Sequence, residues 1–165
     1  VIVKYGNRPL EQEARTTQFV ARHTKGIRIP KVYAVFRDLE NGRCYMVQEK
    51  LPGVPLMQLL PTLDATTRNN LAHELKGVFE QLALLNDMGP MGVVGSPGAF
   101  NLFFFGSPND RTGPLNTPED FIKCIPNAFA TRRPFMTDIP PTDAFNFERS
   151  HVFSHGDLVP ENILV

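Results

Sequence analysis

The most informative segment of the chain is His155-Gly156-Asp157-Leu158-Val159-Pro160-Glu161-Asn162-Ile163-Leu164-Val165. It places a carboxylate, Asp157, five positions before a carboxamide, Asn162, in a short polar loop. Pro160 fixes its own φ and biases Val159 toward extended geometry, which stiffens the loop. We therefore expect the two polar side chains to converge on one point, as a proton acceptor beside a metal ligand.

A purely structural interpretation of this segment competes with the chemical one. His-Gly-Asp is a common turn sequence, and Asp and Asn in loops usually bond to backbone groups. Three features favour chemistry: the proline, the spacing of the two side chains, and the apolar runs Val152-Phe153 and Ile163-Leu164-Val165 on either side. The arrangement H-x-D-x-x-x-x-N is the one in which kinase-like phosphotransferases carry a base and a magnesium ligand.

With these residues the run from Phe153 to Val165 resembles the catalytic loop of the aminoglycoside phosphotransferase family. That family shares its fold with choline kinases and eukaryotic protein kinases. Gly156 stands where protein kinases carry an arginine that binds a phosphorylated activation loop, which favours a small-molecule kinase. Val159 and Glu161 depart from the His and Gly that are frequent in the family, and they leave the subfamily open.

The resemblance implies a fold and three roles in the loop. The expected fold is α+β, a protein-kinase-like two-lobed fold of which the chain holds part. Residues 1–52 would form part of a small β-rich N-lobe, and residues 53–165 part of a helical C-lobe ending at the catalytic loop. Asp157 would align the attacking hydroxyl, Asn162 would bind Mg²⁺, and His155 would brace the loop by hydrogen bonding.

The N-terminal segment supplies a candidate phosphate-binding lysine. Lys4 lies in the strand-like run Val1 to Tyr5, where it is either a solvated edge residue or the strand lysine that binds the α- and β-phosphates of ATP. Such a lysine pairs with a glutamate on the following helix, which we predict from Leu10 to about His23. The family has a Glu-Ala pair in this helix, so Glu13 is the expected partner and Glu11 the weaker candidate.

Two further strands lead to a candidate adenine-binding segment. The sequence predicts strands over 29–36 and 44–49, joined by a hairpin turn that contains Asn41-Gly42. The second strand breaks at Lys50-Leu51-Pro52-Gly53. This segment resembles the hinge between the lobes of the family, where backbone groups of Glu49 and Leu51 would bind the adenine edge. A strand followed by a plain Pro-Gly turn is the structural alternative.

Residues 64–88 form the clearest helix pattern, with a single apolar stripe that we expect to be core. The stripe consists of Leu71, Leu75, Val78, Phe79, Leu82 and Leu85. Asp64 or Thr66 can cap the start. A second helix start, with a capping hydroxyl, a proline and two acids, is predicted at Thr117-Pro118-Glu119-Asp120.

The composition and charge of the chain indicate which classes of partner to expect. Hydrophobic residues make up 42% of the chain and charged residues 21%, as in globular proteins. Seventeen basic side chains balance seventeen acidic ones, so neither nucleic acid nor a membrane is an expected partner. Cys44 and Cys124 form no C-x-x-C motif, and no apolar run is long enough to span a bilayer, so a cytoplasmic location is expected.

The sequence thus predicts a kinase that moves the γ-phosphoryl group of ATP, with Mg²⁺, to a hydroxyl of a small molecule. The strand-like patterns at both ends indicate a fragment, which we expect to be weakly active or inactive alone. In the family, a phosphate-covering hairpin would precede Val1 and a second metal-binding aspartate would follow Val165. A catalytically silent nucleotide-binding scaffold is the first alternative and a protein kinase the second. The acceptor and the oligomeric state stay open.

Overall fold

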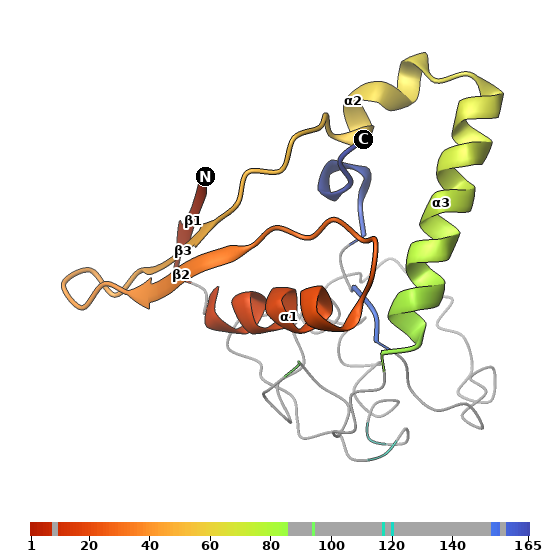
Figure 1. The fold of residues 1–165 in the computed structure, drawn as a ribbon. Coiled ribbons are helices and arrows are strands. Elements are labelled where there is room, and N and C mark those ends of the chain that lie inside the picture. The colour runs from red at the N-terminus through yellow and green to blue at the C-terminus, as the bar shows by residue number, and fades with distance from the viewer. Residues whose placement is uncertain (8–9, 86–93, 95–116, 118–119, 121–152, 156–157) are drawn as a thin grey trace. The chain divides into compact units, whose positions relative to one another are not determined.

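The computed structural model describes residues 1–7, 10–85, 94, 117, 120, 153–155 and 158–165 (Figure 1). By its internal contacts the chain divides into two compact units, Val1–Asn86 with Val152–Val165, and Asp87–His151. All helices and strands named below belong to the first unit. Asp157 and most of the helix predicted after Thr117 lie outside the described residues. The expected lobe boundary at residue 52 stays a prediction.

A three-stranded antiparallel sheet forms the first part of the chain. Its strands are β1 (Ile2–Gly6), β2 (Val32–Arg37) and β3 (Cys44–Gln48), in the spatial order β1-β3-β2. Burial alternates along the central strand β3, where every second side chain is buried, as expected for a strand with one covered face. The three predicted strands are confirmed with small shifts of their ends. β2 begins later than predicted because Pro30 has no amide for the ladder.

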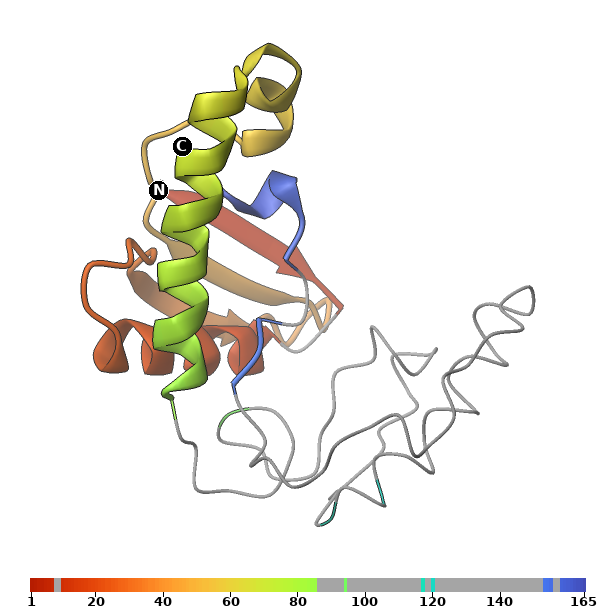
Figure 2. The ribbon, with the colours of Figure 1, turned by 90° about the vertical axis from the view of Figure 1, so that its right-hand side faces the viewer.

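Helix α1 (Leu10–His23) covers one face of this sheet and packs against β2 and β3 (Figure 2). Ala14 and Val20 are its buried residues, and Met46 and Cys44 of β3 are fully buried. The predicted helix is confirmed over its full length. Its burial against the central strand sets the position of the polar side chains in its first turns.

The turn between β2 and β3 is closed by side chains as well as by the backbone. The Gly42 amide donates to the Asp38 carbonyl at 2.9 Å. The φ of Gly42 is 70°, a conformation that glycine adopts without strain. The Asp38 carboxylate accepts from the Glu40 amide at 2.9 Å, and the Asn41 carboxamide oxygen accepts from the Arg43 amide at 2.9 Å. The predicted Asn-Gly hairpin turn is confirmed.

Helix α3 (Ala65–Ala83) is shorter than predicted. Asp64 caps its start, because its side chain accepts the Thr67 amide at 2.8 Å. The prediction that the helix continues to residue 88 is wrong. It ends at Ala83 because the Leu84 amide bonds back to the Gln81 carbonyl, which tightens the last turn.

The apolar stripe of α3 is core only in its C-terminal part. Leu82 and Leu85 are buried in a cluster with Val20 of α1, whereas Phe79 is 44% exposed, so its predicted place in the core is wrong. Partly buried apolar side chains that pack against this cluster are Phe19, Ile29, Val78 and Phe153. The cluster thus joins α1 and α3 to the residues just before the catalytic loop. None of the described helices is long and apolar enough to cross a membrane.

Two short helical segments were not predicted: α2 (Leu56–Leu59), continued by the 3-10 turn η1 (Leu60–Thr62), and the 3-10 turn η3 (Pro160–Asn162) in the catalytic loop. At the second predicted helix start, the Thr117 hydroxyl accepts from the Asp120 amide at 3.2 Å, and the Asp120 carboxylate accepts from the Thr117 amide at 3.3 Å. These reciprocal bonds form a helix cap at the two residues of that segment that the structure describes.

Candidate active site

Lys4 and Glu13 form an ion pair between β1 and α1. The Lys4 Nζ lies 2.5 Å from the Glu13 Oε1. Lys4 faces the helix because it stands opposite the buried Met46 in the ladder, on the covered side of the sheet. Both side chains are nearly half exposed, at 45% and 43%. The predicted contact is therefore present, and it holds an ammonium group in a fixed place that a ligand can reach.

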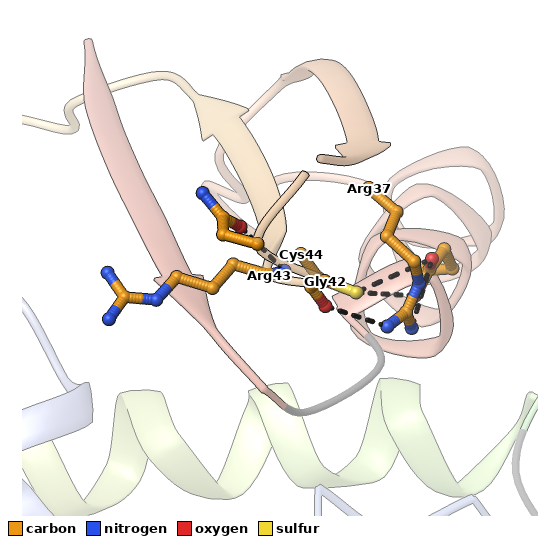
Figure 3. A network of polar contacts seen from close by, with 6 residues as sticks. Arg37, Gly42, Arg43 and Cys44 are labelled. Carbon is orange, nitrogen blue, oxygen red and sulfur yellow. Dashed lines mark hydrogen bonds and ion pairs between the residues drawn. The ribbon is translucent and has the colours of Figure 1, made fainter. Parts of the chain in front are cut away.

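Glu11, the weaker candidate for this pairing, is engaged elsewhere. Both of its carboxylate oxygens lie 3.6 Å from the Cys44 Sγ, and one lies 3.9 Å from an Arg37 nitrogen. Arg37 also donates to the Gly42 carbonyl at 3.0 Å. Figure 3 shows Arg37, Gly42 and Cys44 converging at the end of the hairpin, while the side chain of Arg43 points away. This network connects the first turn of α1 to the hairpin. Glu13 is therefore the carboxylate that pairs with Lys4.

The predicted adenine-binding segment begins where β3 ends. The Glu49 amide donates to the Lys31 carbonyl at 2.8 Å, and the Lys31 amide donates to the Glu49 carboxylate at 3.1 Å. Lys31 also places its Nζ 5.8 Å from the centre of the Tyr33 ring. Because the amide of Glu49 is engaged, its carbonyl is the group it would offer to an adenine edge. Leu51, two residues on, is half-buried.

The catalytic loop is described on both sides of Asp157, which itself lies outside the described residues. Val159 is extended, with φ −116° and ψ 155°, as predicted for a residue before proline. Pro160 then starts η3, in which the Asn162 amide donates to the Val159 carbonyl at 2.9 Å. The side chains of His155 and Asn162 are exposed. The convergence of Asp157 and Asn162, and the common cleft with Lys4, stay predictions.

Each end of this loop is anchored to a different part of the fold. On the N-terminal side, the ring of Phe153 lies 6.2 Å from that of Phe19 on α1. On the C-terminal side, Val54 and Val165 exchange two backbone hydrogen bonds of 3.0 Å, and the Leu56 amide donates to the Ile163 carbonyl at 2.8 Å. The predicted strand after the loop is therefore an isolated bridge, in which Pro55 pairs with Leu164.

We refer to this pairing of residues 54–56 with 163–165 as the bridge ladder. The sequence does not reveal this ladder, because Pro52-Gly53 is typical of a turn and nothing nearby identifies the partner segment. The apolar run Ile163-Leu164-Val165 was the only signal that a pairing segment follows the loop. The bridge ladder brings the residues just after the adenine-binding segment next to the residues just after Asn162.

The donor set of the loop suits magnesium rather than a softer metal. Asn162 offers a carboxamide oxygen, a hard ligand of the kind that Mg²⁺ prefers. Within the part of the chain that the structure describes, no group of three or more His, Cys, Asp or Glu side chains is placed to hold a metal. Binding of Mg²⁺ by Asn162 stays a prediction.

An α+β arrangement with an ion-paired strand lysine and an H-x-D-x-x-x-x-N loop defines a kinase-like phosphotransferase. The chain matches the phosphotransferase enzyme family APH over residues 4–165, and it belongs to that family. The match begins at Lys4 and runs through the catalytic loop, and it confirms the resemblance stated above. Comparison with curated proteins and comparison with solved structures give no match.

Proposed function

We propose that the protein transfers the γ-phosphoryl group of ATP to a hydroxyl group of a small molecule. The Lys4–Glu13 ion pair carries the proposal, because it sets an ammonium group on a strand of a chain that belongs to a phosphotransferase family. A strand lysine held by a helix glutamate is the device that kinases use for the α- and β-phosphates. An exposed pair that stabilises the fold only weakly is well explained by such a role.

The remaining roles follow the chemistry of phosphoryl transfer, which needs positioning and charge neutralisation. The Glu49 carbonyl and the Leu51 amide bind the adenine edge. The oxygen of the acceptor hydroxyl forms a bond to the γ-phosphorus, and Asp157 accepts the proton of that hydroxyl. The bond between the γ-phosphorus and the leaving ADP breaks. Asn162 holds Mg²⁺, which when bound neutralises charge on the phosphates. His155 braces the loop.

The proposal includes the two-lobed kinase-like fold, with residues 1–52 and 53–165 in different lobes, and a cytoplasmic location, where ATP is supplied. The acceptor is a small molecule with a free hydroxyl, and neither nucleic acid nor a membrane takes part. Glutamate at position 13 rather than 11 is the pairing residue, since Glu11 is already engaged by Arg37 and Cys44.

The test is transfer of labelled phosphate from ATP and Mg²⁺ by the purified full-length protein to a panel of aminoglycosides, amino alcohols, sugars and a generic protein substrate. We expect a labelled small molecule, loss of transfer in Asp157→Asn, and retained nucleotide binding in that variant. Nucleotide binding by the unchanged protein without transfer to any acceptor would favour the scaffold alternative. Transfer to a protein substrate alone would favour a protein kinase.

A further inference from the structure

Gly53 lies at a close approach between two segments that are far apart in the sequence. Its φ is +128°, a backbone conformation that residues with side chains rarely adopt. A Cβ at this position would lie 3.1 Å from the Leu164 Cβ and 3.1 Å from the Val165 carbonyl oxygen. Both neighbours belong to the segment that follows the catalytic loop. A Cβ at residue 53 would therefore require this segment to shift by a few tenths of an ångström.

The bridge ladder transmits such a shift to Asn162. Val54, next to Gly53, is bonded twice to Val165, and Leu56 is bonded to Ile163, the neighbour of Asn162. On the other side, Gly53 is two residues after Leu51 of the adenine-binding segment. Gly53 thus lies between the residues proposed to bind adenine and the ladder that leads to the residue proposed to bind Mg²⁺.

The proposed adenine-binding side of this contact is anchored to the sheet. Glu49 continues the central strand and is clamped to Lys31 by its amide and its carboxylate. The segment after the loop forms the backbone hydrogen bonds of the bridge ladder, and η3 contacts α2. When the two segments are forced apart, the segment that carries Asn162 is expected to move.

We propose that Gly53 is a positioning residue of the phosphotransfer site, which sets the place of Asn162 relative to the adenine-binding segment. The inference rests on the proposed function. Gly53 touches neither nucleotide nor metal. It acts by letting the bridge ladder close, so that the carboxamide of Asn162 stands where a metal on the nucleotide phosphates needs it. Loss of such a supporting contact commonly weakens metal binding about 10–100-fold.

Gly26 provides a matched control. It also has a positive φ, 76°, but a Cβ there would have no atom within 4 Å. Gly26→Ala therefore introduces backbone strain without a contact to the loop, and the strain is smaller than at Gly53 because φ 76° is closer to the left-handed region that other residues reach. A loss of stability in either variant reports strain, whereas a changed Mg²⁺ dependence confined to the Gly53 variants reports the displaced segment.

The experiment measures the Mg²⁺ concentration that half-saturates phosphoryl transfer in the unchanged full-length protein, Gly53→Ala, Gly53→Val and Gly26→Ala. We expect this concentration to rise about tenfold or more in both Gly53 variants. Gly26→Ala should match the unchanged protein, and nucleotide affinity without metal should be equal in all four proteins. Melting midpoints are measured alongside, because a merely structural role lowers them without changing the Mg²⁺ dependence.

A Gly53→Ala protein with an unchanged Mg²⁺ dependence would overturn the inference and leave the proposed function standing. An unchanged protein without transfer to any acceptor would overturn the function, and the inference with it. If both Gly53 variants fail to fold, amide hydrogen exchange on the unchanged protein decides. Slower exchange at Val54 and Val165 with Mg²⁺-ATP than with ATP and a chelator supports the inference, and equal exchange contradicts it.

Discussion

Lys4 and Glu13 have separable contributions to folding and to chemistry. Because both side chains are nearly half exposed, the pair should add only about 0–1 kcal/mol to the free energy of unfolding. Its contribution to the proposed phosphoryl transfer should be larger, since removing one group that stabilises charge in a transition state costs about 10²-fold in rate. We therefore expect Lys4→Met to lower kcat/KM for ATP about a hundredfold, with the melting midpoint almost unchanged.

The neighbouring carboxylate serves as the control for the glutamate of this pair. Glu13→Gln and Glu11→Gln make the same chemical change two positions apart on α1. Glu11 contacts Arg37 and Cys44 rather than Lys4, so its variant should keep most of the transfer rate. Equal losses of kcat/KM in the two variants would show that a general change in the helix, and not loss of the contact with Lys4, causes the loss of activity.

Asp64 makes helix α3 sensitive to acid. Its carboxylate accepts the backbone and side-chain hydrogen bonds of Thr67, and these hold the pKa of Asp64 below its usual value. Because the pKa of Asp64 is lowered in the folded state, its ionised carboxylate stabilises the folded state fully above the ordinary aspartate pKa of about 3.9. This stabilisation is lost as the pH falls below that value and through the lowered pKa. Asp64→Ala should thus lower the melting midpoint at pH 7, and the difference should shrink below about pH 4.

Thr66→Ala distinguishes this cap from general changes in the first turn. Thr66 was the other candidate for the cap, and it lies two residues further into the turn. We expect Thr66→Ala to lose less stability than Asp64→Ala. If the two losses are equal and depend on pH in the same way, the Asp64 carboxylate is not the cap.

At the scale of helices and strands, the elements that the sequence predicted correctly are those with local signals. The apolar run of β3, the Asn41-Gly42 turn and the length of α1 each follow from side chains within a few residues. The periodicity of α3 shows which residues share a side of the helix but not how far along it a neighbour packs. For this reason Leu82 was correctly assigned to the core and Phe79 was not.

Met46 contributes to the packing of the sheet against α1. It is fully buried in the central strand, opposite Lys4 and under the helix. Met46→Ala should lower the free energy of unfolding by about 2–5 kcal/mol, the usual cost of truncating a buried methionine. Denaturant unfolding followed by circular dichroism measures the change.

The same substitution at an exposed site tests the reason for this loss. Met57 in α2 is 44% exposed. Met57→Ala should therefore change the free energy of unfolding by about 0.5 kcal/mol or less, as is usual for a surface substitution. Similar losses at residues 46 and 57 would show that burial under α1 is not the cause.

At the scale of the whole molecule, the candidate site is built from segments that the sequence alone does not bring together. The Lys4–Glu13 pair could be predicted, because strand and helix are adjacent in the chain and the family pattern singles out Glu13. The bridge ladder could not, because it joins residues far apart in the sequence, and its marker is one glycine in an ordinary Pro-Gly turn. The apolar run Ile163-Leu164-Val165 indicates that a pairing segment follows the loop, but a backbone contact of this kind leaves no pattern that identifies the partner.

A nucleotide that engages all of these segments must stabilise the molecule as a unit. Binding at a ligand concentration of about 100 Kd adds about 2.7 kcal/mol to the free energy of unfolding. For a chain of this length the gain should raise the melting midpoint by about 5–10 °C with Mg²⁺-ATP. Lys4→Met should abolish most of this shift, because it removes the group proposed to bind the phosphates, whereas Met57→Ala should leave it intact. A shift of equal size in Lys4→Met would place the nucleotide away from the β1–α1 ion pair, and the proposed site would be wrong.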